Sequence, residues 1–177
     1  MKILFKLFVL YLVTLSLTVI SAESYFADEL SAINVKTPAS QYITAGQPSP
    51  NDLSTLAKSQ VKVVINLRGE GEFDDFNEAE TVKKLNMKYI HIPINGPADL
   101  TAENVAKFHQ ALQSTSLDHN EKVFIHCASS NRVGALFALE AFYYQNKSSE
   151  EAIQIGKNAG LASLENKVKT IILSEEK

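Results

Sequence analysis

The sequence predicts an α/β protein with a mainly parallel central sheet that is flanked by helices on both faces. Short apolar runs at 61–67, 88–94 and 122–126 alternate with longer segments that carry apolar residues at helical spacing. This order is expected when helices cross over between parallel strands. The run at 61–67 is rich in β-branched residues and fits a strand buried on both faces better than an alternating, half-exposed one.

The first 22 residues have the pattern of a signal peptide. Lys2 and Lys6 give a positive start, an uncharged apolar run extends over 7–20, and Ser21 and Ala22 offer a cleavage point. The run is shorter than the roughly 20 residues that cross a bilayer, although an uncleaved anchor is an alternative. We therefore expect an exported protein, periplasmic in a Gram-negative source, without stable membrane insertion after signal removal.

Residues 23–177 are expected to form a single domain, in which 23–40 is a loosely ordered arm with an edge strand at 32–36. The formal net charge is −3, so the composition offers no broad basic surface for nucleic acid. One cysteine permits neither an internal disulfide nor a thiolate metal site. We expect no metal and no cofactor, and the sequence leaves the oligomeric state open.

Helix signals separate the predicted strands. Ser49 followed by Pro50 predicts a helix over 50–59, because serine is a favoured N-cap and proline fits the first helical turn. An acidic loop at 69–75 follows the first strand. Apolar residues then mark the inner face of a helix that precedes the strand at 88–94: Phe76, Ala79, Val82 and Leu85.

The second half of the chain predicts four more helices. Thr101 caps a helix after the turn-rich loop at 95–99, and an almost uniformly apolar helix over 132–145 is expected in the middle of the fold. A capping box at 148–151 opens a helix that ends near Gly160. Ser163 is expected to cap the last helix, which has an apolar stripe formed by Leu164, Val168, Ile171 and Ile172.

A polar loop after the strand at 122–126 holds the only cysteine and ends at an arginine. Cys127 lies at the strand's carboxyl end and faces the first turn of a helix, where backbone N–H groups and the helix dipole favour a thiolate and bind oxyanions. Arg132 can hold such an anion through two parallel hydrogen bonds. The structural alternative is a buried, inert cysteine.

This loop resembles the active-site loop of cysteine-dependent phosphatases, the protein tyrosine and dual-specificity phosphatase superfamily. The residues at 63–68 resemble the "VINLR" strand of the dual-specificity branch. The residues at 42–49 resemble the "SGQPS" segment of the bacterial beta-lactamase hydrolase-like phosphatase domain. The resemblance implies a three-layer phosphatase fold. It also implies hydrolysis of a phosphomonoester, from a small ester or a phosphoprotein, through a Cys127 thiophosphate intermediate.

The resemblance implies roles for individual residues. Cys127 is the expected nucleophile, Arg132 the oxyanion ligand and Asp99 the general acid, with Asp74 and Asp75 as alternatives. A helix-capping role is the structural alternative for Asp99. The residues expected to bind the substrate are those of the loop: His126, Ala128, Ser129, Ser130 and Asn131. Three further residues are expected to be structural: Arg68, His91 and His109.

The loop also departs from the phosphatase pattern. It is one residue shorter, Ser129 and Ser130 stand where a mid-loop glycine is expected, and Val133 stands where a hydroxyl residue follows the arginine. A loop of this length resembles that of rhodanese-type sulfurtransferases, which would carry a persulfide on Cys127. A weakly active anion-binding module is the third alternative.

Overall fold

The computed structural model describes residues 29–72, 75–115, 118 and 120–176. The chain divides into two units at Leu30 and Ser31, and the fold below is that of the second unit, Ser31–Lys177. The predicted signal peptide at 1–22 lies outside the described residues. Within the part of the chain that the structure describes, no helix is long and apolar enough to cross a membrane.

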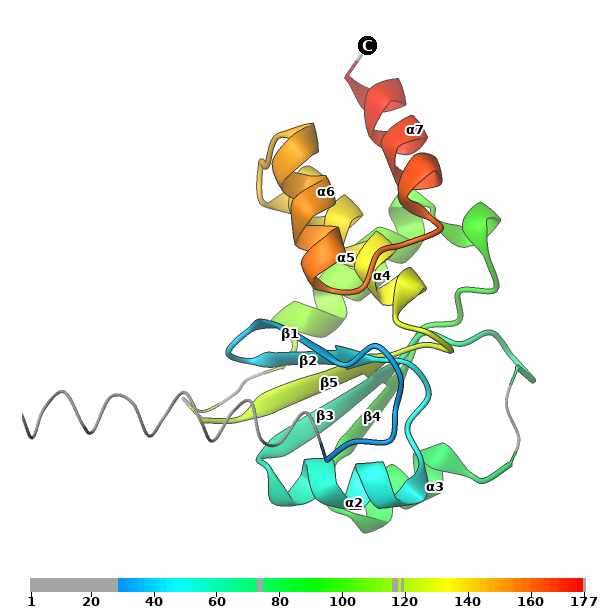
Figure 1. The fold of residues 1–177 in the computed structure, drawn as a ribbon, viewed down its shortest axis with the longest axis vertical. Coiled ribbons are helices and arrows are strands. Elements are labelled where there is room, and N and C mark those ends of the chain that lie inside the picture. The colour runs from blue at the N-terminus through cyan, green and yellow to red at the C-terminus, as the bar shows by residue number, and fades with distance from the viewer. Residues whose placement is uncertain (1–28, 73–74, 116–117, 119, 177) are drawn as a thin grey trace, which may run out of the picture. The chain divides into compact units, whose positions relative to one another are not determined.

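The described residues form one five-stranded sheet with the order β1-β2-β5-β3-β4. Four strands run parallel, namely β2 (Tyr42–Ala45), β5 (Lys122–His126), β3 (Val61–Asn66) and β4 (Lys88–His91), whereas β1 (Lys36–Ala39) is antiparallel to β2. Helices cover both faces, with α2 and α3 on one face and α4 to α7 on the other (Figure 1). The predicted fold class is therefore confirmed.

The helices follow the predicted order along the chain. Their bounds are α2 Pro50–Lys58, α3 Glu78–Lys84, α4 Ala102–Gln113, α5 Asn131–Tyr144, α6 Ser149–Asn158 and α7 Glu165–Glu175, with a 3-10 turn at Pro97–Asp99. The predicted caps are present at α2 and α6, where Ser49 and Ser148 each form a capping box with the acid three residues later. These starts are set by local sequence because the cap bonds span only one turn.

The predicted central helix is α5, whose residues 133–141 are all buried. It contacts α4, α6 and α7. At Gly134 a Cβ atom would lie 2.0 Å from the backbone nitrogen of Leu161, so only glycine lets α5 approach the turn between α6 and α7 this closely. The first turn of α5, which carries Arg132, is thus held from several sides.

The edges of the sheet differ from the prediction. The edge strand expected at 32–36 lies at 36–39, and β2 is a strand that was not predicted from the sequence. β2 has four residues and ends at a Gly-Gln-Pro turn, so its pattern is too short to stand out. β4 ends at His91 and its residues are exposed or half-buried, because an edge strand has a neighbour on one side only.

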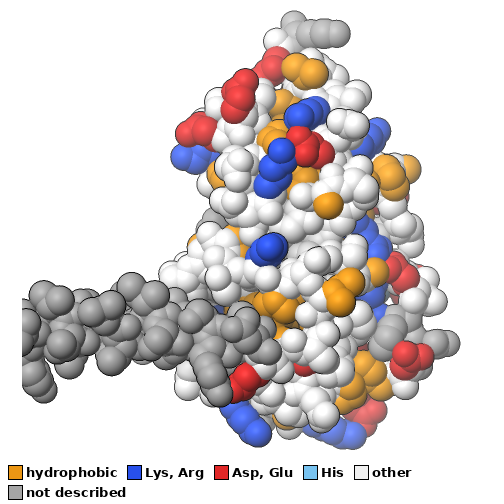
Figure 2. Space-filling model, viewed as in Figure 1, with side chains coloured by type: hydrophobic (Ala, Val, Ile, Leu, Met, Phe, Trp, Pro, Cys, Tyr) orange, Lys and Arg blue, Asp and Glu red, His pale blue; other side chains and the backbone are white. Residues whose placement is uncertain are grey.

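Ser163 does not cap the last helix. The N-cap position of α7 is Leu164, without a side-chain cap bond, and the Ser163 hydroxyl instead accepts a 2.7 Å hydrogen bond from Asn131 Nδ2. The apolar stripe of α7 is confirmed at Val168 and Ile172, which are buried. On the face drawn in Figure 2, basic and acidic side chains are interspersed rather than gathered into areas of one sign.

Candidate active site

The loop between β5 and α5 is shaped by the turn that follows α6. Ser130, the last residue before α5, has a left-handed backbone with φ 68° and does not cap the helix with its side chain. Its hydroxyl donates to the Ala159 carbonyl at 3.0 Å. A Cβ atom on Gly160 would lie 2.4 Å from the Ser130 hydroxyl oxygen. A non-glycine residue in this turn would therefore displace the loop.

Two loop carbonyls point toward the side of the sheet formed by β1 and β2. The Ala128 carbonyl accepts from the Gln47 amide at 3.3 Å, and the Ser129 carbonyl accepts from Asn34 Nδ2 at 3.0 Å. Both peptide units are trans, so the amide hydrogens of Ser129 and Ser130 point in the opposite direction to these carbonyls. The residues after Cys127 are thus tied to the end of β2, where Gly46 and Ser129 also form an antiparallel bridge.

The structure brings Cys127 and Arg132 together. Cys127 is fully buried and belongs to the core cluster that includes Val105 and Val133. The hydrogen bond from Arg132 to Glu72 raises the pKa of Arg132, burial opposes the rise, and the charge and hydrogen bonding of the Cys127 sulfur add to it. The Cys127 sulfur is thus among the groups that act on the Arg132 guanidinium, as the loop sequence predicts.

Glu72 binds the guanidinium of Arg132 at two points. Arg132 Nη1 donates to Glu72 Oε2 at 2.6 Å and to the Ile94 carbonyl at 2.7 Å, and Nη2 donates to Glu72 Oε1. The Gly69 amide also donates to Glu72 Oε2, at 2.8 Å. The bonds from Arg132 lower the pKa of Glu72 and outweigh the opposing effect of burial. Phosphate binds arginine in the same two-point geometry.

Glu72 was not among the site residues predicted from the sequence, although it belongs to the predicted acidic loop at 69–75. That loop follows the carboxyl end of β3, which is the edge where parallel sheets bind ligands. This position was the signal that the sequence offered for an acidic site residue. The sequence alone does not say which acid of the loop faces the arginine.

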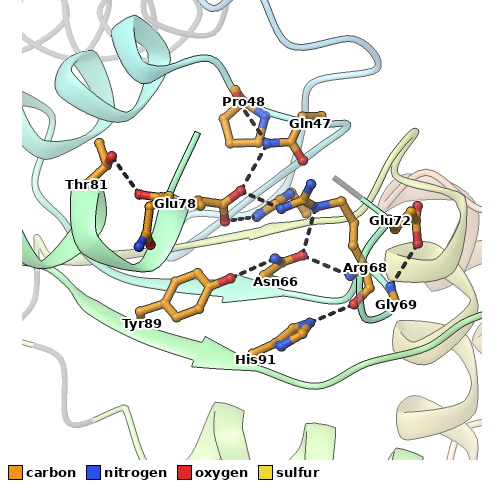
Figure 3. Close-up of polar contacts among 12 residues, drawn as sticks. Gln47, Pro48, Asn66, Arg68, Gly69, Glu72, Glu78, Thr81, Tyr89 and His91 are labelled. Atoms are coloured by element: carbon orange, nitrogen blue, oxygen red, sulfur yellow. Dashed lines mark hydrogen bonds and ion pairs between the residues drawn. The ribbon is translucent and has the colours of Figure 1, made fainter. Parts of the chain in front are cut away.

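A second group of polar residues lies on the other face of the sheet, around Glu78 of α3. Glu78 Oε2 accepts from Arg68 Nη2 at 2.9 Å and from Gln47 Nε2 at 3.0 Å (Figure 3). Its other carboxylate oxygen bonds His126 Nε2 at 2.7 Å. Burial acts to raise the pKa of Glu78, but the hydrogen bond and charge of His126, with Gln47 and Arg68, outweigh burial and lower it.

This arrangement engages the side chain of His126, one of the residues predicted to bind substrate, with Glu78. His126 is fully buried and directed at Glu78, whereas Cys127 packs in the core on the face of α4 and α5. Successive residues of a strand point to opposite faces, so His126 and Cys127 cannot both face the same cavity. His126 instead connects the end of β5 to α3.

The residues predicted to be structural have structural partners. Arg68 bonds Asn66 and Glu78, and the Arg68 carbonyl lies 2.7 Å from His91 Nε2 (Figure 3). His109 bonds Glu140 at 2.9 Å and stacks on Tyr144. These contacts confirm the structural interpretation of Arg68, His91 and His109.

Asp99 fastens the turn after β4. Asp99 Oδ2 accepts from the amide and from the side-chain nitrogen of Asn95, both at 2.8 Å, and these two bonds lower the pKa of Asp99. It is Thr101, not Asp99, that caps α4 through its hydroxyl. The turn lies beside the site because the Ile94 carbonyl bonds Arg132. Of the alternative acids, Asp75 is exposed and Asp74 lies outside the described residues.

The side chain of Asn131 faces the segment between α6 and α7. Asn131 Oδ1 accepts from the amides of Ala162 and Leu164, at 2.8 and 3.3 Å, and its nitrogen donates to Ser163. A contribution of Asn131 to anion binding is therefore limited to its backbone. Among the described residues, no group of three or more His, Cys, Asp or Glu side chains could hold a metal ion.

Comparison with known proteins agrees with this geometry. The family model of the DSP-PTPase phosphatase fused to NAD+ kinase matches residues 23–172. A beta-lactamase hydrolase-like protein of Xylella fastidiosa is 26% identical over 120 residues, which cover 66% of this chain and 27% of that protein. The chain thus spans about a quarter of the length of the curated relatives it matches.

Solved structures share the fold at low sequence identity. Tk-PTP in its active form superposes with a TM-score of 0.57 and 18% identity, covering 80% of this chain and 94% of that chain. A DUF442 protein from Shewanella putrefaciens CN-32 gives a TM-score of 0.60 and 22% identity, covering 82% and 94%. The predicted phosphatase-like three-layer fold is thereby confirmed. The chain belongs to the DSP-PTPase phosphatase family whose model describes a fusion to NAD+ kinase, a family of protein tyrosine and dual-specificity phosphatases, which are hydrolases.

Proposed function

We propose that the protein is a cysteine-dependent phosphatase that hydrolyses a phosphomonoester at Cys127 and Arg132. One observation carries the proposal. The Arg132 guanidinium binds the Glu72 carboxylate at two points, and the Cys127 sulfur contributes to the raised pKa of Arg132. A phosphate offers paired oxygens as a carboxylate does, so the position of Glu72 is a ready site for a phosphate next to the sulfur.

In the first step, the Cys127 thiolate attacks phosphorus, an S–P bond forms and the ester O–P bond breaks. The Arg132 guanidinium and the loop amides from Ala128 to Asn131 stabilise the charge on the equatorial oxygens. In the second step, water attacks the same phosphorus, the S–P bond breaks and phosphate leaves. Both steps proceed without a change in oxidation state.

Asp99 is the proposed general acid, which gives the leaving alcohol its proton and then takes one from water. Such a group contributes about 10²–10⁴-fold to the rate. Its bonds to Asn95 keep the carboxyl ionised, so the proposal requires these bonds to open when substrate binds. Asp99→Asn should lower kcat for alkyl phosphates, whose leaving groups need the proton, far more than for aryl phosphates. Equal effects would remove Asp99 from this role.

Binding of substrate also requires Glu72 to leave the guanidinium. The Cys127 sulfur is fully buried, so phosphorus can reach it only when the groups beside it move. Such a movement occurs when the substrate phosphate replaces the Glu72 carboxylate at Arg132. The exchange has little electrostatic cost, because the guanidinium remains paired with an anion throughout.

The decisive experiment uses purified protein with its thiol reduced. We expect hydrolysis of para-nitrophenyl phosphate, inhibition by vanadate, and loss of turnover in Cys127→Ser. Rapid quenching of the wild type should give a mass increase of one phosphoryl group, carried by the peptide that contains Cys127. A protein that shows neither turnover, nor vanadate inhibition, nor this adduct is not a phosphatase of this kind.

An anion-binding module without turnover is the second candidate, favoured by the complete burial of Cys127 and by the pairing of Arg132 with Glu72. It predicts calorimetric binding of phosphate that depends on Arg132, with no hydrolysis of any ester. Because the short loop resembles that of rhodanese-type sulfurtransferases, thiosulfate should be tested as a substrate in the same assay. A persulfide on Cys127 and transfer of sulfur to cyanide would assign a sulfurtransferase instead.

We also propose that the protein is exported through its first 22 residues. The support is the sequence pattern of the segment. The N-terminal mass of the protein recovered from the periplasm of a bacterial host should correspond to cleavage after Ala22. Retention of the full chain in the membrane fraction would favour an uncleaved anchor.

A further inference from the structure

A pocket of about 380 Å³ lies on the outer side of the cysteine loop. Three segments that are distant in the sequence form its walls: the start of β1, the loop itself and the turn between α6 and α7. The side chains and backbone that line it are those of Asn34, Lys36, Ser129, Asn131, Lys157 and residues 160–163. Two lysines and no carboxylate are present in this lining.

Hydrogen bonds hold the three walls against one another. Asn34 Nδ2 donates to the Ser129 carbonyl at 3.0 Å, and Asn131 joins the loop to Ala162 and Ser163. α6 also contacts β1. Lys36 and Lys157 therefore extend from fixed backbone on two sides of the pocket, which reduces the entropy lost when they bind a shared ligand.

The pocket is close to the sulfur along the chain. Ser129 lies two residues after Cys127, and two trans peptide units separate their Cα atoms by at most about 7.6 Å. A group in the pocket and a phosphate on Cys127 would thus lie on either side of the same short loop. A single substrate occupies both positions only if it spans this loop.

The charge around the pocket remains positive after the nearby ion pairs are counted. Lys36 is exposed, and Lys157 lies 3.1 Å from Glu165. The same carboxylate also binds Lys169 at 2.6 Å, so one negative charge is shared by two lysines. Lys36 and Lys157 of the lining thus give two positive charges against the one carboxylate, Glu165, that pairs with Lys157, and such a local excess attracts anions.

We propose that this pocket is a second anion subsite, which binds the second phosphate of a substrate that carries two phosphate groups close together. The proposal rests on the phosphatase function at Cys127 and names the substrate class of that site. Lys36 and Lys157 are specificity residues in this scheme. They bind the phosphate that is not cleaved, so their removal should raise KM and leave kcat unchanged.

The test compares glucose 1,6-bisphosphate with glucose 6-phosphate, and a doubly with a singly phosphorylated peptide. Wild-type protein should prefer the bisphosphorylated member of at least one pair in kcat/KM. Lys36→Gln and Lys157→Gln should each reduce that preference by roughly two- to fivefold, the range of exposed charge pairs, and the double variant should abolish it. The pair that responds to the lysines identifies the source, sugar or peptide.

Lys58→Gln, an exposed change on α2, is the matched control and should leave the preference intact. Raising the salt concentration should weaken the preference in wild type but not in the double variant. No preference in wild type, or an equal loss for mono- and bisphosphates in the lysine variants, would overturn the subsite. If no ester is hydrolysed, the phosphatase proposal fails separately, and calorimetric binding of the same four compounds to Cys127→Ser still decides the subsite.

Discussion

Two arginine–glutamate pairs lie near the carboxyl end of the sheet, and they differ in burial. Arg68 and Glu78 expose only 6% and 3% of their side chains. Arg132 and Glu72 expose 13% and 30%. Glu78 bonds three side chains at once, Arg68, Gln47 and His126, whereas Glu72 bonds one side chain and the Gly69 amide.

The difference shows which pair is structural and which can exchange. Loss of Glu78 would remove a carboxylate that the buried Arg68 guanidinium bonds, which is costly. Loss of Glu72 leaves Arg132 near the surface, where water or a substrate anion can take its place. The same pair of residue types therefore stabilises the fold on one face and provides a replaceable ligand on the other.

The largest expected effect is that of Glu78→Gln on stability. Removing one partner of a buried ion pair typically costs about 3–5 kcal/mol of unfolding free energy, and Gln47 and His126 lose their charged partner as well. Denaturant unfolding measures this change. Glu80→Gln, which removes an exposed pair with Lys84 on the same helix, is the control and should change stability little. A similar result for both variants would contradict the structural role of Glu78.

Arg132→Ala should instead act on catalysis. Loss of one oxyanion ligand costs about 10²–10³-fold in turnover, while the unfolding free energy should change by less than about 1 kcal/mol because the pair is part-exposed. Steady-state kinetics with an aryl phosphate gives the first value. Arg132→Lys should recover only part of the activity, since lysine cannot bind an anion at two points. Full activity in Arg132→Ala would refute the proposed site.

Lowering the pH should reveal the contribution of Glu78 to the unfolding free energy. Its pKa is lowered in the folded protein from the usual 4.5, so the unfolded chain binds more protons at low pH. The stabilisation from Glu78 is fully present above about pH 4.5 and is lost as pH falls through the folded-state pKa. The unfolding free energy of wild type should therefore fall more steeply with acid than that of Glu78→Gln. Parallel curves would contradict this assignment.

The smallest expected effect is that of Glu72→Gln. Glu72 competes with the substrate anion for Arg132, so removing its charge should strengthen the binding of phosphate or vanadate by roughly two- to fivefold, the range of part-exposed ion pairs. Inhibition constants for vanadate provide the measurement. Weaker binding in the variant would show that Glu72 orients Arg132 rather than competing for it.

The sequence by itself determined the fold class, the order of most elements and the meeting of Cys127 with Arg132. These features depend on short-range signals. Ser49 and Ser148 cap their helices within one turn, and the cysteine and arginine are joined by a single strand–loop–helix connection. A strand of four residues such as β2 is too short to show a recognisable hydrophobic pattern.

Only the tertiary structure decided the partners. Glu72 binds an arginine 60 residues away, and Glu78 binds a histidine 48 residues away. It also assembled the lysine-lined pocket from three distant segments. Local sequence fixes where a strand or helix begins, but the choice among several nearby acids or lysines depends on how those elements pack, because a charge pairs with whichever group packing places beside it.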